Sequence, residues 1–433
     1  MKKTRRVLSL LLCAALIFAL IPAVPAAAAD GQFTQSRLTV AAEKSSALAP
    51  GVREDAYTVY DRNGDQVKMW VTTADPTLDT VKLFASYKNM DPTNYGMSKL
   101  TEQVASFNEK SNAGDAYYQG TVVAGINASY YNMINGKPTG AFVMNGVDVT
   151  TEAEGNQYGY FALMKDGSVK IGKPGEYSSD KGSIQEAIGI YRMLVVDGAI
   201  CANLDDATKY PRQTIGITAD GKVVLMTADG NQEPRSIGLT LREQAQVMLD
   251  LGCVAAGHLD GGGSCTYGAR AEGTSGFALV NSPSDGSERS ISNGFLIVST
   301  AVSDGVFANA ALTAEHSYVT PGSAVAVSAV GTDKAGAPAE IPDDVTWTLE
   351  NSELGTVRDG VFRSNGTVGD ARVQMVYNGA VVGETTVHVV IPDAIRFTSQ
   401  TITIPYGKTA KLEIAATYGA SDVATKEDDF VLT

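Results

Sequence analysis

The chain has 433 residues, of which 44% are hydrophobic and 19% charged, and its formal net charge at pH 7 is −14. This length is enough for about two to four domains with buried cores. The acidic balance argues against nucleic acid or anionic lipid as a binding partner.

The sequence does not indicate a metal site. It contains only three histidines and four cysteines, and no cysteine spacing resembles a zinc site. No calcium-loop motif is evident, although the many Asp and Asn residues leave a bound Ca²⁺ open. We therefore predict no metal ligands and no cofactor.

The N-terminus has the three parts of a secretory signal peptide. Four basic residues lie within positions 2–6, an apolar stretch covers 7–24, and small residues at 27–29 precede the expected cleavage after Ala29. A membrane anchor is the alternative, but the apolar run leads directly into the cleavage signal. Cleavage leaves 30 basic and 48 acidic side chains and three cysteines, an odd number that allows at most one disulfide. We expect a secreted or cell-surface protein without a membrane span in its mature form.

The mature sequence divides into regions of different texture. Residues 30–51 are small, polar and alanine-rich, and they predict a linker. Residues 52–302 mix strands with a few helices, which predicts an α+β catalytic domain with a mixed sheet. Residues 303–391 and 392–433 alternate apolar with polar residues and predict all-β immunoglobulin-like modules, the second of them partial.

Capping residues and apolar runs predict the elements of the first domain. Thr240 and Glu243 form a capping box before a helix over 241–251, and shorter helices are predicted to start at Ser98 and Ser183. Strands are predicted at 57–61, 68–72, 80–86, 121–126, 159–164, 193–197, 214–218, 222–227, 254–259 and 294–298.

The C-terminal region contains an internal repeat with strand and turn signals at similar spacing. The first copy comprises 321–322, 325–327 and 343–349, and the second comprises 405–407, 412–414 and 428–433. Between them, Asp359-Gly360 predicts a tight hairpin turn. The pattern resembles bacterial immunoglobulin-like modules, which implies a spacer or an adhesion unit. Because the second copy stops at Thr433, we expect the sequence to be a fragment of a longer protein.

The segment His-Leu-Asp-Gly-Gly-Gly-Ser at 258–264 is the first candidate for chemistry. Three consecutive glycines cost backbone entropy, so they suit a place where a ligand approaches the main chain or where φ is positive. A carboxylate at a strand end, here Asp260, can combine acid–base work with the anion binding of nearby N–H groups. A tight turn that carries one polar residue is the alternative reading.

Three further segments carry polar or aromatic candidates. Asn127 and Tyr130 follow an apolar strand, where a tyrosine can stack on a sugar or simply fill the core. Arg212 starts a strand and suits a bidentate contact with phosphate, or else a surface ion pair. Residues 287–295 form a polar approach to another apolar strand.

In this order the segments resemble the phosphodiester glycosidase family over residues 52–302. The matching pieces are Ile126-Asn127 with the aromatics after it, Arg212-x-Thr214-x-x-Ile217, the helix with Glu243 and Ala245, Leu259-Asp260-Gly261-Gly262-Gly263-Ser264, and Arg289-x-x-x-Asn293. The sequence departs from the family pattern at His258 and Ala128, which bears on sugar specificity.

The resemblance implies hydrolysis of a sugar-1-phosphodiester, for example of N-acetylglucosamine, on a cell-surface or extracellular glycan. It implies that Asp260 performs acid–base or nucleophilic work, that Arg212 holds the phosphate, and that Glu288 is a second carboxylate. The substrate-binding residues that it implies are Asn127, Tyr130, Thr214, His258, Gly261, Gly262, Gly263, Ser264, Arg289 and Asn293.

Two other functions compete with this hydrolase. One is a non-catalytic protein that binds cell-wall or capsule glycan and carries immunoglobulin-like spacers. The other is a metal-dependent phosphodiesterase that cleaves the P–O bond, which the lack of a His/Asp cluster with two-metal spacing disfavours.

Overall fold

The structure is a computed structural model that describes residues 33–397, 414–426 and 429. The predicted signal peptide at 1–29 lies outside these residues, as do 405–407, 412–413 and most of 428–433 from the second repeat copy. No helix in the described part of the chain has both the length and the apolar character needed to cross a membrane.

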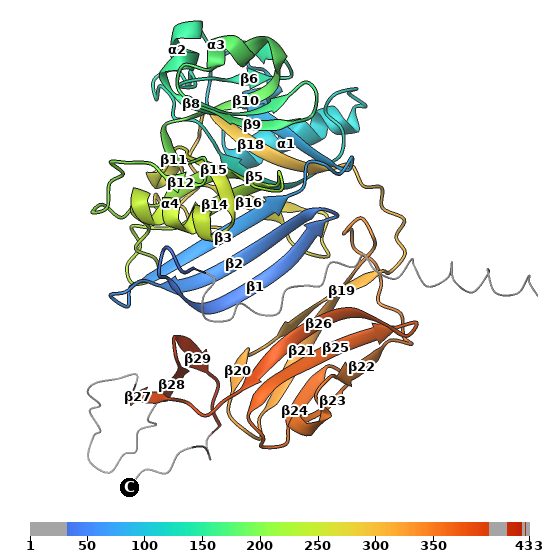
Figure 1. Cartoon of the computed structure of the whole chain (residues 1–433). Helices are drawn as coiled ribbons and strands as arrows, with labels where there is room; N and C mark the ends of the chain where they lie inside the picture. The colour runs from blue at the N-terminus through green and yellow to red at the C-terminus, as the bar shows by residue number, and fades with distance from the viewer. Residues whose placement is uncertain (1–32, 398–413, 427–428, 430–433) are drawn as a thin grey trace, which may run out of the picture. The chain divides into compact units, whose positions relative to one another are not determined.

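The first domain is organised around an eight-stranded sheet, here called sheet 1 (Figure 1). In spatial order its strands are β1 (Thr39–Ala49), β2 (Val52–Tyr60), β3 (Gln66–Ala74), β14 (Val223–Ala228), β13 (Arg212–Thr218), β15 (Cys253–His258), β11 (Arg192–Val196) and β12 (Ala199–Ile200).

Two five-stranded sheets accompany sheet 1. Sheet 2 has the order β7 (Val147–Asp148), β6 (Val143–Met144), β10 (Ile184–Ile190), β8 (Gly159–Met164) and β9 (Val169–Gly172). Sheet 3 has the order β17 (Phe277–Leu279), β16 (Tyr267–Arg270), β5 (Thr121–Asn127), β18 (Asn293–Ser299) and β4 (Val81–Tyr87).

Strands β2, β3 and β14 of sheet 1 each contribute side chains to two cores. In β14, Val223 and Leu225 join a core shared with sheets 2 and 3, whereas Val224 and Met226 join a second core. Successive side chains of a strand point to opposite faces, which produces this division. It also explains why β14 is an apolar run without alternation.

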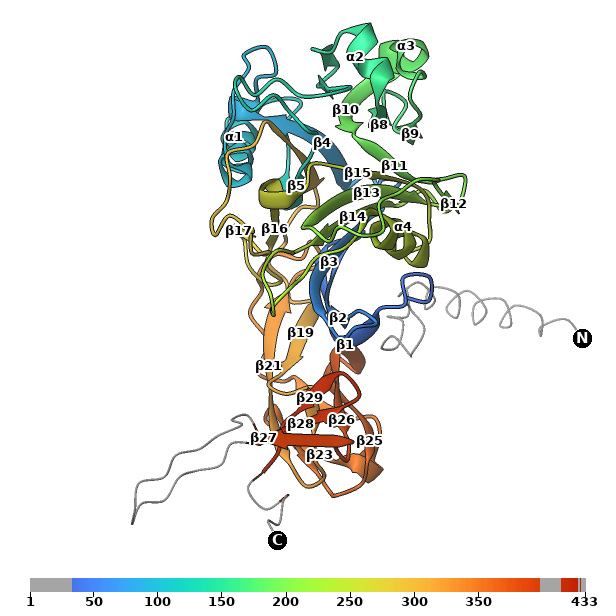
Figure 2. The same ribbon diagram turned by 90° about the vertical axis from the view of Figure 1, so that its left-hand side faces the viewer.

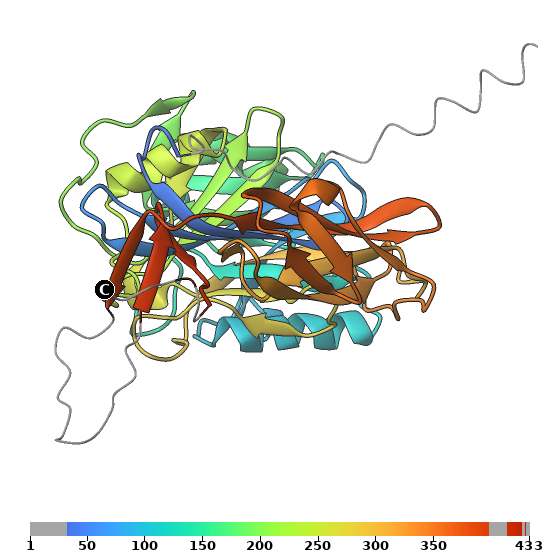
Figure 3. The same cartoon turned by 90° about the horizontal axis from the view of Figure 1, so that it is seen from below.

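Four α-helices are described: α1 (Leu100–Asn112), α2 (Glu152–Gln157), α3 (Tyr177–Asp180) and α4 (Leu241–Asp250). Helix α4 packs beside β11 and β15 (Figure 2) and closes the second core with Ala245, Val247 and Met248. Helix α1, cyan in Figure 3, lies against β5, β4 and β18. The predicted capping box Thr240–Glu243 is present.

Three predictions about the first domain are corrected. Every strand pair in sheets 1 to 3 is antiparallel, so the expected mixed sheet is wrong. Strands outnumber helices, as the sequence predicts. Residues 39–49 of the expected linker form β1, which pairs along its length with β2. All ten predicted strands occur within one or a few residues of the expected positions.

The short helix expected from Ser183 is instead strand β10. Glu186 in this strand is fully buried and accepts backbone N–H bonds from Ala85 (3.0 Å) and Asn145 (2.9 Å), and a hydrogen bond from Tyr117. Burial raises the pKa of Glu186 to about 8. The Ser-x-x-Glu pattern therefore reflects a tertiary contact of the carboxyl group and not a helix cap.

The C-terminal region contains two four-stranded sheets. Sheet 4 has the order β19 (Asn309–Ala314), β21 (Ala324–Thr332), β24 (Val361–Ser364) and β23 (Gly355–Arg358). Sheet 5 has the order β20 (Tyr318–Val319), β26 (Ala380–Val389), β25 (Gly369–Tyr377) and β22 (Thr346–Leu349).

Sheets 4 and 5 share one core, in which Val325 and Phe362 of sheet 4 meet Val373 and Val387 of sheet 5. The turn between β23 and β24 has φ values of 49° and 73° at Asp359 and Gly360, as predicted for a tight hairpin. A three-stranded sheet follows, with the order β27 (Ala394–Phe397), β28 (Ile414–Tyr418) and β29 (Ser421–Val423).

Removal of the α4 cap should lower stability measurably. Thr240 Oγ1 accepts from Glu243 N at 3.0 Å, and Thr240 N donates to Glu243 Oε2 at 2.8 Å. We expect Thr240→Ala to reduce the free energy of unfolding in urea by about 1 kcal/mol. Thr240→Ser keeps the hydroxyl and is the matched control. Equal stability of the Ala and Ser variants would contradict this assignment.

Candidate active site

The glycine-rich loop lies where strand ends of sheets 1 and 3 meet. Loop residue Asp260 follows β15 of sheet 1, and its N–H donates to the carbonyl of Ala128, directly after β5 of sheet 3, at 2.9 Å. Because β13 is antiparallel to β15, the start of β13 lies beside the end of β15. The start of β18 likewise lies beside the end of β5. Four strand ends therefore surround the loop.

Different structural constraints favour glycine at positions 262 and 263 of the loop. Gly262 has φ of +63°, a conformation that favours glycine. A Cβ on Gly263 would come within 2.1 Å of Asp285 Oδ1 and 2.4 Å of Arg289 Nη2. The N–H of Gly262 donates to the carbonyl of Pro211 at 3.0 Å, so this group is not available to an anion. Glycine at 263 thus allows a charged pair to approach the main chain.

Asp260 has the surroundings of an acid–base group. Burial raises its pKa to about 6, while a hydrogen bond with Ser264 and the positive charge of Arg289 act to lower it. The carboxyl group therefore changes protonation close to neutral pH. This is the range in which a catalytic acid or base works well.

Arg289 is the cation that the structure places beside this carboxyl group. Its Nη1 lies 3.3 Å from Ser264 Oγ, and its Nε and Nη2 contact Asp285 Oδ2 at 2.8 and 2.6 Å. The ion pair with Asp285 fixes the guanidinium and leaves it partly exposed. A hydroxyl, a cation and a carboxyl group are thereby gathered at one loop.

Arg212 is buried and forms hydrogen bonds within the protein that the sequence does not predict. Its Nε and Nη2 donate to the carbonyls of Leu239 and Thr208 at 2.7 and 2.8 Å. Its charge still acts on Tyr130 and His258. Arg289 is 32% exposed, whereas Arg212 is buried, so Arg289 is the more accessible of the two cations for direct contact with a phosphate.

Two further predicted residues do not face the loop. Both carboxylate oxygens of Glu288 accept from Thr101, at 2.9 Å from the backbone N–H and 2.7 Å from the hydroxyl, at the first turn of α1. A negative charge stabilises a helix at that end. Thr214 is completely buried in sheet 1, where its hydroxyl accepts from Gln244 of α4. Their polar groups have structural partners, which argues against the predicted catalytic and binding roles.

Asn127 and Asn293 brace the main chain around the loop. Asn127 Nδ2 donates to the Asp260 carbonyl at 2.7 Å, and its Oδ1 accepts from Thr266 N at 2.9 Å. Asn293 Oδ1 accepts from Ser129 N at 2.9 Å. Both side chains are buried. They hold the loop and strand ends in place, and substrate contact remains a prediction for them.

His258 and Tyr130 form the other wall of the site. Burial, with a contribution from the charge of Arg212, lowers the pKa of His258 to about 3, so its ring is neutral at physiological pH. His258 Nε2 lies 3.4 Å from the hydroxyl of Tyr130. Burial and the charge of Asp260 raise the pKa of Tyr130 to about 12, so the phenol keeps its proton.

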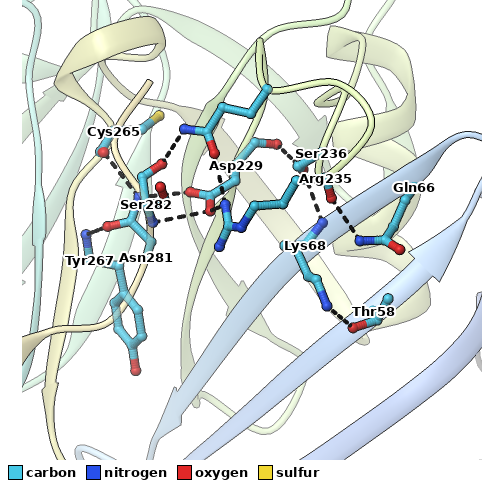
Figure 4. Close-up of polar contacts among 11 residues, drawn as sticks. Thr58, Gln66, Lys68, Asp229, Arg235, Ser236, Cys265, Tyr267, Asn281 and Ser282 are labelled. Carbon is cyan, nitrogen blue, oxygen red and sulfur yellow. Dashed lines mark hydrogen bonds and ion pairs between the residues drawn. The ribbon is translucent and has the colours of Figure 1, made fainter. Parts of the chain in front are cut away.

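A buried polar network supports the loop from behind (Figure 4). Asp229 Oδ1 accepts from Asn281 Nδ2 at 2.9 Å, and its Oδ2 accepts from Arg235 Nη1 at 2.7 Å. Asn281 in turn donates to the Cys265 carbonyl at 3.1 Å and accepts from Tyr267 N at 2.8 Å. The segment after Ser264 is therefore fixed by the buried side-chain amide of Asn281.

Asp285, Asp229 and Asn281 support the site without being predicted from the sequence. Asp285 lies four residues before Arg289, a spacing that could have suggested the ion pair. Asp229 and Asn281 have no such signal, since they meet only through the fold. Cys201, Cys253 and Cys265 are all free thiols. Within 33–397, 414–426 and 429, no group of three or more His, Cys, Asp or Glu residues could hold a metal ion.

The raised pKa of Asp260 predicts a pH-dependent gain in stability for Asp260→Asn. The folded-state pKa lies above the ordinary 3.8, so ionisation opposes folding as pH rises from about 4 through 6. We expect the variant to be more stable than the parent by about 1 to 3 kcal/mol at about pH 7.5, and by much less at about pH 4.

Urea denaturation at both pH values measures this difference. Asp285→Asn is the control, because that carboxylate is partly exposed and paired with Arg289, so its removal brings no such gain. If Asp260→Asn were no more stable than the parent protein at either pH, the carboxyl group of Asp260 would not be desolvated.

Comparisons with known proteins identify the region that carries this site. Residues 120–298 match the family model for phosphodiester glycosidases. The chain is 30% identical over 217 residues to the SPbeta prophage-derived uncharacterized protein YomE of Bacillus subtilis (strain 168), covering 47% of this chain and 31% of that protein. It is 29% identical over 161 residues to the human N-acetylglucosamine-1-phosphodiester alpha-N-acetylglucosaminidase, covering 33% and 30% respectively. The chain thus spans about a third of the length of these curated relatives.

Solved structures with a similar arrangement include the catalytic domain of the zebrafish N-acetylglucosamine-1-phosphodiester alpha-N-acetylglucosaminidase. It has a TM-score of 0.47 and 19% identity, covering 61% of this chain and 88% of that chain. A hypothetical protein from Synechocystis has a TM-score of 0.46 and 14% identity, covering 60% and 64%. All of the candidate residues discussed above lie within 120–298. On the family-model match, residues 120–298 are similar to the phosphodiester glycosidases.

Proposed function

We propose that this chain is an exported hydrolase that cleaves a sugar-1-phosphodiester into a free sugar and a phosphomonoester. The observation that carries the proposal is the set of groups around Asp260, whose pKa is raised to about 6 beside Ser264 and Arg289. The family match and the substrate named for the human and bovine relatives support N-acetylglucosamine-1-phosphodiesters as the first substrates to test.

Hydrolysis at the anomeric carbon requires stabilisation of the departing phosphate and an activated water. Arg289 supplies a positive charge held by Asp285, and its Nη1 donates to Ser264 Oγ at 3.3 Å, which places this cation beside the hydroxyl that hydrogen-bonds Asp260. Arg289 suits a phosphate oxygen better than Arg212 because it is partly exposed, whereas Arg212 is buried.

Asp260 acts in its ionised form in this proposal. A phosphomonoester has a second pKa of about 6, so it leaves the sugar without needing a proton from the protein. Asp260 accepts a proton from water, the water oxygen bonds to the anomeric carbon, and the electrons of the C–O bond go to the phosphate oxygen. Tyr130 keeps its proton and can donate to the sugar.

The chain is further proposed to act outside the cell. The signal-peptide pattern of 1–29 supports export, and the repeat pattern after 303 supports immunoglobulin-like spacers. The alternative is a glycan-binding protein without turnover, which would use the tyrosines beside His258. A turnover assay with a sugar-1-phosphodiester separates these two functions.

Loss of the proposed charged groups should abolish turnover. We expect Asp260→Asn to lower kcat/KM by about 10³-fold, because no base remains for the water. Arg289→Ala should lower it by about 10²- to 10³-fold, because the developing phosphate charge loses its cation. Release of reducing sugar from methyl N-acetylglucosamine-1-phosphodiester measures both effects.

Arg372→Ala is the matched control for the arginine change, because Arg372 on β25 pairs with Glu350 and lies outside the matched region. It should leave kcat/KM unchanged. Full activity in both site variants would overturn the mechanism, and absence of turnover in the parent protein would favour the glycan-binding alternative.

The pH dependence of kcat/KM tests the protonation state of Asp260. Since the ionised carboxylate is the active form, the rate should rise with pH and level off above about 6, the pKa of this group in the free protein. Arg289→Ala should move the midpoint upward, because the positive charge of Arg289 lowers that pKa. A rate that falls as pH rises through 6 would assign Asp260 as the acid instead.

A further inference from the structure

A groove opens beside the candidate site, where sheets 1 and 2 meet. Its volume is about 470 Å³, within the usual range for small-molecule pockets. The lining residues come from four segments: 157–159 at the start of β8, Pro174 after β9, 191–193 at the start of β11, and 202–204 after β12. None of the residues predicted for catalysis or binding lies in this lining.

Aromatic rings connect the groove to the site. The rings of Tyr158 and Tyr191 are stacked with centroids 5.7 Å apart, and the rings of Tyr191 and Tyr130 lie 4.4 Å apart. Tyr191 is anchored by its backbone N–H, which donates to the carbonyl of His258 at 3.0 Å. The three tyrosines therefore form a row that leads from the groove to the neighbourhood of Asp260.

The groove offers both apolar and polar contacts. Tyr191 is 41% exposed, which is unusual for a large aromatic residue in a ring cluster, and Arg192 lies 5.6 Å from its ring centroid. Among the described residues, no protein group forms a hydrogen bond with the hydroxyls of Tyr158 and Tyr191 or with the side-chain amide of Asn203, and all three line the groove. Aromatic rings beside unpaired polar groups are suited to a sugar, which has apolar C–H faces and many hydroxyls.

The position of the groove relative to Asp260 determines which part of a substrate it can reach. Ser264 and Arg289 lie beside the carboxyl group of Asp260. Tyr130, which belongs to the aromatic row, is close enough for the charge of Asp260 to raise its pKa. The cationic groups suit the phosphate, and the aromatic row suits the sugar. A glycan that extends beyond the first sugar, away from the phosphate, would therefore enter the groove.

We propose that this groove is a glycan-binding subsite for the second sugar of an oligosaccharide that carries the phosphodiester at its reducing end. This inference rests on the proposed function for the placement of the phosphate, and it deepens that function by naming the substrate class as an oligosaccharyl-1-phosphodiester. Tyr158 and Tyr191 contact the second sugar through their exposed ring edges and hydroxyls, and Asn203 and Arg192 contact its hydroxyls.

Chain-length selectivity tests this subsite in the active protein. The substrates are methyl phosphodiesters of N-acetylglucosamine-1-phosphate and of N,N′-diacetylchitobiose-1-phosphate, with glucose and cellobiose analogues as a second pair. The parent protein should have a kcat/KM at least about 10-fold higher for the two-sugar member of one pair. Tyr191→Ala and Tyr158→Ala should bring that ratio close to 1.

Two controls protect the selectivity ratio from effects of folding. Tyr158→Phe keeps the ring and should keep most of the ratio. Tyr418→Ala removes another exposed tyrosine, on β28, and should change neither the ratio nor the rate on the one-sugar substrate. A ratio near 1 in the parent protein for both pairs would overturn the subsite while leaving the proposed function intact.

A binding measurement separates failure of the subsite from failure of the proposed function. Calorimetry with N,N′-diacetylchitobiose, its trisaccharide, cellobiose and cellotriose uses the full chain with and without Tyr191→Ala. Suppose that the parent protein hydrolyses no phosphodiester but binds one of these glycans at least about 10-fold more tightly than Tyr191→Ala does. The glycan-binding subsite is then supported, and the proposed hydrolase function is rejected. If no glycan binds and no length selectivity is measured, the inference is wrong.

Discussion

The joining of two sheets at one loop is the constraint on which the rest of the site depends. Asp260 N donates to the carbonyl of Ala128, and Asn127 Nδ2 donates to the carbonyl of Asp260. Through these two bonds the strand end of sheet 1 and the strand end of sheet 3 fix the same residue. The partial burial that raises the pKa of Asp260 follows from this junction, since strands close around the loop.

A charged group lies on one side of this junction and an aromatic group lies on the other. On one side, glycine at 263 lets the Asp285–Arg289 pair approach the loop, and the arginine brings a fixed cation to Ser264. On the other side, a buried neutral histidine supports Tyr130, and the aromatic row begins there. An acidic protein that acts on an anionic substrate needs such a local cation, because its net charge of −14 repels phosphate at long range.

The sequence predicted local features better than partners in space. The strands, the capped helix α4 and the loop at 258–264 have local signals, namely apolar runs, a capping box and three glycines. Glu288 and Asp285 are both acidic residues near Arg289, and nothing local shows that one caps α1 while the other pairs with the arginine. Glu186 was misread for the same reason, since its partners Ala85 and Asn145 lie far away in the chain. The antiparallel pairing of sheets 1 to 3 also depends on connections that strand patterns do not encode.

The central claim is that water, activated by Asp260, attacks the anomeric carbon and leaves the phosphate bonds intact. Hydrolysis of a sugar-1-phosphodiester in ¹⁸O-labelled water, followed by mass spectrometry of both products, tests this claim most directly. The account predicts that the label appears at the anomeric oxygen of the released sugar and that the phosphomonoester contains none. Label in the phosphomonoester would mean that the P–O bond is cleaved, and it would contradict the role assigned to Asp260 and Arg289.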